Sequence, residues 1–282
     1  MWQIIFCYTS AMPELPEVET SRRGITPHIV DKKIAQIILR HSKLRWPIPK
    51  DITQIFSAQY IEQIQRRGKY LLLITPVGTL ILHLGMSGSL RIVKNDAPAQ
   101  KHDHVDIVFT HGISLRFTDP RRFGCLLWTN ADPMQHPLLK HLGVEPLSKA
   151  FNVSYLFQQT RKRKLTSKQL LMNSHIIVGV GNIYASEALF AAGIRPTKIA
   201  ARLTKTQCQA LVNAIKKILR RAINAGGTTL SDFTQSDGKP GYFKQKLQIY
   251  GRTGEPCYQC QTPIKEKTIA ARNSFYCPQC QK

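Results

Sequence analysis

Residues 70–84 read YLLLITPVGTLILHL, two runs of aliphatic residues separated by Pro76-Val77-Gly78. Two short apolar runs on either side of a Pro/Gly turn are typical of adjacent antiparallel strands. Outward from this pair, similar runs rich in Val, Ile, Leu and Phe recur between turns that contain Gly, Pro, Asn or Asp. The expected strands are 34–39, 70–75, 79–84, 89–93, 105–109, 114–117 and 125–128. Regular short strands at this spacing predict a β-sandwich or a barrel.

Helical patterns flank the strands on both sides. Residues 16–23 begin with Pro, carry acids in the first turn and precede Gly24, which predicts a short helix ending there. Beyond Pro146 helices are expected at 148–160, 167–174, 182–192 and 204–225. In the last of these Thr204 and Gln207 make a capping box. Its apolar stripe consists of Leu211, Ile215, Ile218 and Leu219, and its basic outer face of Lys216, Lys217, Arg220 and Arg221.

Length and charge limit the classes of function. The chain has 282 residues with 40 Lys+Arg against 17 Asp+Glu, a net charge of +23. This length predicts two or three domains, and 43% hydrophobic residues exclude a wholly disordered chain. The sequence contains no apolar run long enough for a transmembrane helix. Because the positive charge is spread along the chain, a nucleic acid is favoured over a membrane surface as the polyanionic partner.

Four of the seven cysteines form the pattern Cys257-x2-Cys260-x16-Cys277-x2-Cys280. Two CxxC pairs at this separation are typical of a tetrahedral zinc site on a hairpin. The alternative is two disulfides, which no export signal supports. Four thiolates leave no open position for water, so we expect one structural zinc ion.

The N-terminal residues 1–11, MWQIIFCYTSA, contain no Lys or Arg and do not resemble a signal peptide. We interpret them as a leader absent from the mature protein. Removal of Met12 would then leave Pro13 with a free secondary amine. An α-amino group titrates at about 8, so it could attack an electrophilic carbon while Glu14 supplies or accepts a proton. The spacing of residues 13–20 alone favours a simpler interpretation, a helix N-terminus with acidic residues in its first turn.

The stretch PELPEVET at 13–20 resembles the opening of the bacterial formamidopyrimidine-DNA glycosylases, and further motifs follow in that family's order. They are QRRGKY at 65–70, HLGMSG at 83–88, KHDH at 101–104, TDPRRFG at 118–124, GVGNIYASE at 179–187 and QSDGKPGY at 235–242. The resemblance extends from residue 12 to residue 282. The related endonuclease VIII group usually lacks the Asp-Pro-Arg-Arg-Phe-Gly run.

The resemblance implies an α+β fold of three parts. These are an N-terminal β-sandwich with flanking helices, a helix–two-turns–helix middle domain and a C-terminal zinc-bound β-hairpin. The expected divisions are a leader over 1–12, a catalytic domain over 13–147, a DNA-binding domain over 148–237 and a zinc finger over 238–282.

The implied activity is removal of oxidised purines, chiefly 8-oxoguanine and formamidopyrimidines, followed by strand cleavage through β,δ-elimination. By similarity Pro13 forms a Schiff base with the deoxyribose C1′, and Glu14 is the proton donor. Lys69 and Arg272 would be the proton donors for β- and δ-elimination. A buried lysine can hold a depressed pKa, whereas a guanidinium keeps its charge and suits phosphate binding better than proton transfer.

The resemblance also implies a DNA-binding surface. Because a damaged base must be flipped out of the duplex, Met86, Arg121 and Phe123 are expected to fill the vacated space. The Gly-rich turn at 179–182 is expected to offer amides to a phosphate. The basic run 161–164 is expected to line the DNA track. Residues 228–242 are expected to form a mobile lid over the lesion. Further DNA contacts are expected at His102, Arg163, Lys168 and Asn182, and lesion recognition at Glu17 and Tyr242.

The partner implied is duplex DNA carrying an oxidised purine or an abasic site, bound by a monomer at the nucleoid in the bacterial cytoplasm, with no membrane contact. Two alternatives remain: a zinc-hairpin protein that recognises damaged DNA without chemistry, and an RNA-binding or ribosomal accessory protein. Pro13 separates the first alternative from catalysis, since a chain that keeps residues 1–11 has a non-nucleophilic tertiary amide at this position.

Overall fold

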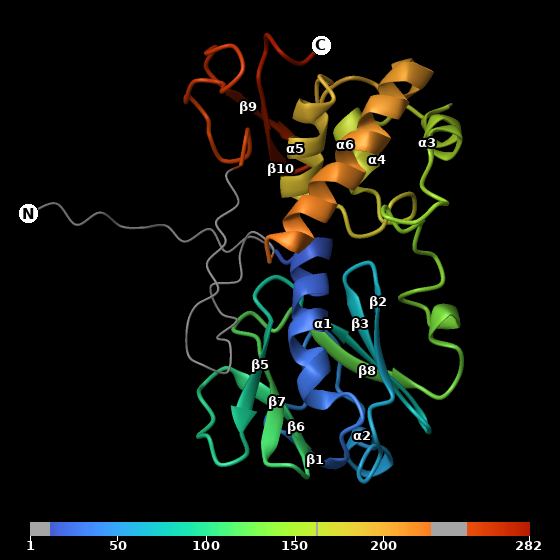
Figure 1. Cartoon of the computed structure of the whole chain (residues 1–282), viewed down its shortest axis with the longest axis vertical. Coiled ribbons are helices and arrows are strands. Elements are labelled where there is room, and N and C mark those ends of the chain that lie inside the picture. The colour runs from blue at the N-terminus through green and yellow to red at the C-terminus, as the bar shows by residue number, and fades with distance from the viewer. Residues whose placement is uncertain (1–11, 162, 227–246) are drawn as a thin grey trace, which may run out of the picture.

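The computed structural model describes residues 12–161, 163–226 and 247–282. Figure 1 shows two lobes, one of strands and one of helices with a small hairpin. Helix α1 (Leu15–Ile29) runs along the sheet lobe, and its first turn lies where the two lobes meet. The expected leader (1–11) and the expected lesion-capping segment fall on residues outside the described ranges.

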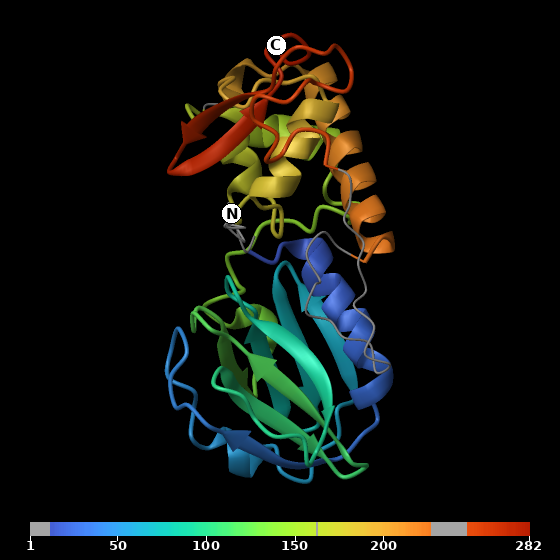
Figure 2. The same ribbon diagram turned by 90° about the vertical axis from the view of Figure 1, so that its left-hand side faces the viewer.

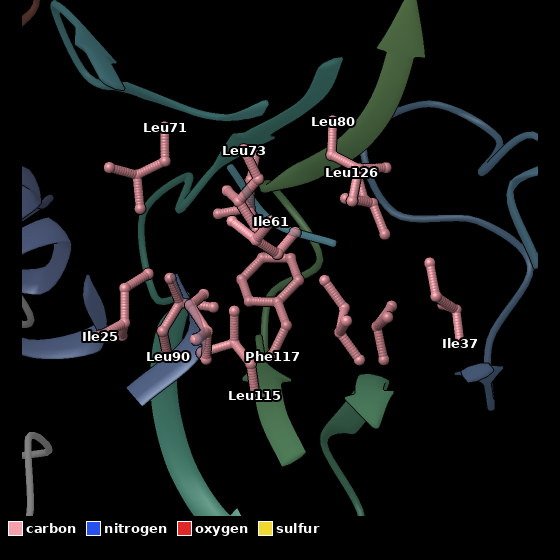
Figure 3. Close-up of a cluster of buried hydrophobic side chains, with 14 of the residues drawn as sticks. Ile25, Ile37, Ile61, Leu71, Leu73, Leu80, Leu90, Leu115, Phe117 and Leu126 are labelled. Atoms are coloured by element: carbon pink, nitrogen blue, oxygen red, sulfur yellow. The ribbon is translucent and has the colours of Figure 1, made fainter. Parts of the chain in front are cut away.

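The sheet lobe is a sandwich of two four-stranded antiparallel sheets, as expected. One sheet has the order β1 (Ile34–Leu39), β6 (Asp103–Phe109), β7 (Ile113–Thr118), β5 (Ser89–Lys94). The other has the order β2 (Gln63–Arg67), β3 (Tyr70–Thr75), β4 (Gly78–His83), β8 (Cys125–Thr129). Figure 3 shows the core between them, where Leu71 and Leu80 of one sheet face Leu115 and Phe117 of the other. A short helix, α2 (Ile52–Ile55), packs beside β1.

Strand β2 is absent from the expected set because its sequence, QIQRR, is mostly polar and buries only Ile64. It joins β3 through the two-residue turn Gly68-Lys69, since Arg67 pairs with Tyr70. Gly68 has φ 58°, and glycine at the first central position is typical of a type II′ hairpin turn. This turn places Lys69 at the tip of the hairpin.

The expectation that the first helix ends at Gly24 is wrong, because α1 continues to Ile29 through both Gly24 and Pro27. Ile25 and Ile29 are fully buried in the sandwich core. Burying one such side chain contributes about 1.5–3 kcal/mol, which exceeds the cost of about 1 kcal/mol for a glycine within a helix. Tertiary packing therefore decides where this helix ends.

The helical lobe contains α3 (Val153–Thr160), α4 (Ser167–Met172), α5 (Asn182–Ala191) and α6 (Lys205–Asn224), with a 3-10 turn at Ala200–Arg202. Another 3-10 turn, Pro133–Gln135, lies on the sheet lobe, where Met134 packs against Leu72 and Ile81. Helix α3 starts later than expected because Asn152 caps it, accepting a hydrogen bond from Tyr155 N. The capping box of α6 is confirmed. Its basic face is not wholly solvated, since Lys216 is half-buried and donates to Ser148 O at 2.9 Å.

The C-terminal module is a hairpin of β9 (Lys265–Ile269) and β10 (Arg272–Tyr276), which Figure 2 shows beside the helical lobe. Its small core of Ile249, Ile264 and Phe275 packs against Phe190 of α5. Within the described ranges, no helix combines the length and the apolar character needed to cross a membrane.

Candidate active site and DNA-facing surface

Glu14 connects the start of α1 to the helical lobe. Its side chain is 3% exposed, and its carboxylate accepts hydrogen bonds from Gly181 N (2.8 Å), Ile183 N (2.8 Å) and Tyr184 N (3.3 Å). These amides form the N-terminus of α5, where the helix dipole favours a negative group. Residues about 170 positions apart in the sequence are thus held together at the junction of the lobes.

The glycines of the 179–182 turn are explained by this contact. A Cβ on Gly181 would lie 2.4 Å from Glu14 Cδ, and a Cβ on Gly179 would lie 2.7 Å from Leu15 Cδ1. The turn therefore packs closely against the side chains of Glu14 and Leu15, which leaves no room for a side chain at Gly179 or Gly181. The expectation that its amides are available to a phosphate is wrong for Gly181, because that amide donates to Glu14.

Burial raises the pKa of Glu14, with the neighbouring Glu17 acting in the same direction and Lys69 opposing it. Burial likewise lowers the pKa of Lys69, and the charge of Arg272 adds to that effect. Lys69, at the tip of the β2–β3 hairpin, thus lies close enough to both Glu14 and Arg272, at the start of β10, for their charges to act on it. Pro13, which directly precedes Glu14 in the sequence, is half-buried.

Glu17 has an evident structural role. Its Oε2 accepts from Glu14 N at 3.0 Å, which closes the capping box of α1, and its Oε1 accepts from Tyr184 OH at 2.7 Å. The side chain is 2% exposed. The structure therefore places Glu17 beneath Glu14, linking α1 to α5. Tyr242, the other expected lesion contact, lies outside the described residues.

Lys168 is buried, which the basic surroundings in the sequence do not indicate. It is 1% exposed, and its Nζ donates to Ser186 Oγ at 2.8 Å and to Asn273 O at 3.4 Å. Burial lowers its pKa to about 8, with Glu14 raising it and Arg272 lowering it further. Lys168 therefore belongs to the same cluster as Glu14 and Arg272, rather than to an exposed basic track.

Asn182 brings the first residue of α5 against the zinc hairpin. Its Nδ2 lies 3.1 Å from Asn273 O and 3.5 Å from Tyr250 OH. Glu187, one turn further along α5, accepts from the amides of Ile249 and Tyr250 at 2.9 and 3.0 Å. The hairpin is thus fixed to α5 at two levels, which sets where Arg272 lies.

Glu145, which the sequence analysis did not single out, holds the turn that carries Lys69. Its carboxylate accepts from Gly68 N at 2.6 Å and from the guanidinium groups of Arg66 and Arg67 at 2.9 and 3.0 Å. Glu145 lies 77 positions after Gly68. No local pattern could reveal this contact, which fixes the position of Lys69 through its preceding residue.

The expected wedge residues lie together on the sheet lobe. Met86 is half-buried in the turn between β4 and β5, while Arg121 and Phe123 are exposed in the turn between β7 and β8. The guanidinium carbon of Arg121 lies 4.9 Å from the centroid of the Phe123 ring. His102 is connected to the second turn, since its carbonyl accepts from Asp119 N at 3.0 Å.

The basic run of 161–164 is partly folded back on the helical lobe. Arg163 donates to Gln159 O at 2.6 Å and to Gln159 Oε1 at 3.0 Å. Arg161 donates to Leu203 O at 2.6 Å and stacks on the ring of Phe157 at 4.2 Å. Arg163 is therefore held beside the end of α3.

The four cysteines of the C-terminal module converge on one point. The sulfur atoms of Cys257, Cys260, Cys277 and Cys280 all lie within 4.8 Å of one another, and three of the pairs are 3.3–3.9 Å apart. A ZnS4 tetrahedron with bonds of ~2.3 Å has edges of about 3.8 Å, so this donor set fits a structural zinc ion. The alternative of two disulfides finds no support, since all four are free cysteines.

Comparison with protein-family models gives three matches along the chain. The Formamidopyrimidine-DNA glycosylase N-terminal domain matches residues 12–126 and the Formamidopyrimidine-DNA glycosylase H2TH domain matches residues 142–234. The zinc finger found in FPG and IleRS matches residues 254–282.

Among curated relatives, the formamidopyrimidine-DNA glycosylase of Enterobacter sp. (strain 638) is 56% identical over 271 residues, covering 96% of this chain and 100% of the relative. Among solved structures, the Lactococcus lactis protein in complex with DNA containing N7-benzyl-Fapy-dG is 34% identical with a TM-score of 0.88, covering 96% of this chain and 100% of that one. The same protein in complex with DNA containing an abasic site has a TM-score of 0.87 at 34% identity, over 95% and 99% of the two chains.

Proposed function

The chain belongs to the formamidopyrimidine-DNA glycosylase family, and from this membership we propose how its own residues carry out the reaction. It is a base-excision-repair DNA glycosylase and AP lyase that acts on damaged bases and abasic sites in DNA. Its zinc finger holds one structural zinc ion.

We propose that the damaged bases are oxidised purines, 8-oxoguanine and formamidopyrimidines, in duplex DNA. The Lactococcus lactis structures with a formamidopyrimidine lesion and with an abasic site support this substrate class. The net charge of +23 supports a phosphate-rich partner. A zinc-hairpin binder without chemistry and an RNA-binding protein are both disfavoured by family membership.

The observation that carries the proposed mechanism is the convergence on Pro13-Glu14 of three separate elements. These are the N-terminus of α5, the Lys69 turn and the Arg272 end of β10. In the mechanism the lone pair of the Pro13 nitrogen forms a bond to the deoxyribose C1′ as the bond from C1′ to the base breaks. Glu14 supplies the accompanying proton, a role that suits a buried acid with a raised pKa.

The iminium ion forms when the Pro13 N–H proton leaves and the C1′–O4′ bond breaks, with O4′ taking up a proton. This ion activates the sugar for strand cleavage. We propose that Lys69 transfers the proton in β-elimination, since its lowered pKa makes the amine able to exchange protons. Arg272 would act in δ-elimination. Because a guanidinium keeps its proton, its contribution is best understood as stabilising the departing phosphate.

For DNA binding we propose contacts from His102, Arg163, Lys168 and Asn182, with Met86, Arg121 and Phe123 inserted into the duplex. Glu17 and Tyr242 remain the proposed lesion contacts. Lys168 and Asn182 lie beside the Arg272 hairpin, and this position supports their assignment to a phosphate next to the reacting sugar. We further propose a monomer acting at the nucleoid in the bacterial cytoplasm, with domain divisions near 147 and 237.

Borohydride trapping on a duplex containing 8-oxoguanine tests the mechanism. A chain whose first residue is Pro13 should form a covalent DNA adduct that peptide mass analysis assigns to Pro13. The matched control is the same chain with residues 1–12 retained, in which the Pro13 nitrogen is a tertiary amide. We expect this form to bind the duplex without trapping. Equal trapping by both forms would contradict the role of Pro13, while absence of base release by either would contradict the substrate.

A further inference from the structure

A buried carboxyl group lies between the two turns that carry the proposed wedge. The side chain of Asp119 is fully buried. Its Oδ1 accepts from Ser87 Oγ at 2.6 Å, and its Oδ2 accepts from Gly124 N at 2.7 Å. Ser87 follows Met86 directly, and Gly124 follows Phe123. Each oxygen of one carboxyl group therefore holds a different turn, next to the residue that would enter the DNA.

The two turns also touch through their backbones. A Cβ on Gly85 would lie 2.4 Å from both Phe123 C and Gly124 N. The buried ring of Phe117 lies beneath both turns, since Cβ atoms on Gly88 and Gly124 would lie 2.8 and 2.6 Å from it. No side chain fits between the turns, so their spacing is set by backbone contact and by the bonds to Asp119.

A second hydrogen bond extends this connection to Arg121. Ser87 Oγ, which donates to Asp119, accepts from Arg121 N at 3.1 Å. The next residue, Arg122, has φ 55°, a conformation that costs a residue other than glycine about 1–2 kcal/mol. Such a conformation persists only where the surroundings determine it. The bonds to Ser87 and Gly124 on either side supply that constraint.

We propose that Asp119 is the positioning residue of the wedge: its carboxyl group joins the Met86 turn and the Arg121–Phe123 turn into one rigid block. The inference rests on the proposed function, because a wedge acts only on a duplex from which a base is flipped. Opening a base step costs a few kcal/mol, and ordering loose side chains at that moment adds to the barrier. A wedge fixed in advance avoids this second cost.

Asp119→Asn tests the inference. An NH2 group facing Gly124 N loses that hydrogen bond, whereas an NH2 group facing Ser87 Oγ makes the hydroxyl an acceptor and deprives its proton of the acceptor that Asp119 provides. We expect kcat/KM for release of 8-oxoguanine from duplex DNA to fall by about tenfold, the effect of losing one buried hydrogen bond. Cleavage of an abasic site in a single-stranded oligonucleotide requires no opened base step. It should stay within about twofold of wild type. A general loss of fold would reduce both activities.

Asp106→Asn is the matched control. Asp106 is 2% exposed in the same sandwich and accepts from Arg116 at 2.9 Å, but it belongs to β6 and contacts neither wedge turn. We expect this variant to lose thermal stability and yet release the base at the wild-type rate. If Asp119→Asn does not fold, Ser87→Ala removes the hydroxyl shared by Asp119 and Arg121, and should reduce duplex excision selectively.

A double-mutant cycle with Met86→Ala distinguishes positioning from an unrelated effect. If Asp119 acts through the wedge, the double variant should be no slower on the duplex than the slower single variant. Additive losses would overturn the inference, as would an equal loss on the single-stranded abasic site or the same excision defect in Asp106→Asn. An active wild type with an unimpaired Asp119→Asn contradicts this inference alone. A wild type that releases no oxidised base contradicts the proposed function as well.

Discussion

Glu14 combines two features that a surface acid lacks. Its carboxylate accepts from the amides that begin α5, and it is buried beside Glu17 and Lys69. The amides position the carboxyl group, while burial favours the protonated form. The result is an acid held in a fixed orientation, with a pKa that burial raises above its ordinary value.

Replacing Glu14 with Gln removes that proton and keeps one oxygen acceptor for the α5 amides. We expect release of 8-oxoguanine to fall by at least about 100-fold, the lower range for general acid catalysis. Cleavage of a preformed abasic site needs no proton for a departing base, so it should fall far less. Single-turnover assays on the two substrates measure this difference. Equal losses on both would assign Glu14 a purely structural role.

Glu19 gives the sandwich a defined acid sensitivity. Burial alone would raise the pKa of Glu19, but hydrogen bonds from Arg22 and Arg23 and the charge of Arg66 outweigh it and lower the pKa from 4.5 to about 2. The folded state therefore favours the ionised form. This stabilisation is complete above the ordinary pKa and is lost as the pH falls toward 2.

Comparing wild type with Glu19→Gln by urea unfolding across pH tests this. The wild type should be more stable by a constant amount above about pH 5, and the difference should shrink steadily below that pH. Glu62→Gln, at an exposed position of the same lobe, serves as the control and should show little difference. A gap between wild type and Glu19→Gln that persists unchanged at pH 3 would contradict the assignment.

The sequence predicted residues whose type and spacing are themselves diagnostic of a site. It did not predict residues whose role depends on contacts with distant parts of the chain. The cysteine spacing predicted the zinc cluster, because tetrahedral coordination restricts both residue type and separation. Glu145 has no such local signature, since its partner Gly68 is 77 positions away. Lys168 reads as a solvated charge from its neighbours, and only the fold buries it against Ser186 and Asn273.

Element boundaries follow the same division. The Thr204 capping box was predictable because its hydrogen bonds are local. The end of α1 was not, because Ile25 and Ile29 are retained in the helix by packing against strands that come later in the sequence. Strand β2 also escaped prediction, since its polar side chains pair with Glu145 and Glu19 instead of forming an apolar run.

We expect the hairpin of β9 and β10 to depend on the zinc ion for its folding. Its own core is small, and its turn residues Ala270 and Ala271 have φ 48° and 57°, each costing about 1–2 kcal/mol outside glycine. We expect zinc removal by chelation to disorder the hairpin and carry Arg272 away from Glu14. Zinc binding in such modules contributes on the order of 10 kcal/mol to folding.

Zinc release can be followed with a chromophoric chelator while abasic-site cleavage is measured on the same samples. Cleavage should fall by more than about tenfold as the metal leaves and recover when zinc is added back. The sandwich, whose core is separate, should keep its unfolding transition. A zinc-free protein with undiminished cleavage would show that Arg272 is dispensable.

At the scale of the whole molecule, charge governs encounter with DNA. A net charge of +23 on 282 residues gives a strong attraction to phosphates. If roughly five phosphates are contacted, the logarithm of the binding constant should fall with the logarithm of salt concentration at a slope of about −4 to −5. Fluorescence anisotropy with a labelled duplex measures this slope. Arg163→Ala should reduce it by about one if Arg163 meets a phosphate, and a flat response would contradict a basic DNA surface.

The hydrogen bonds from the first amides of α5 to Glu14 have a consequence for dividing the enzyme into fragments. One half of the polypeptide contributes Glu14, and the other contributes the amides that orient its carboxyl group. If the two halves are expressed as separate fragments, we expect neither fragment to release a base or cleave DNA alone. Activity should return only when the fragments are mixed. Recovered activity would then measure the association of the two fragments.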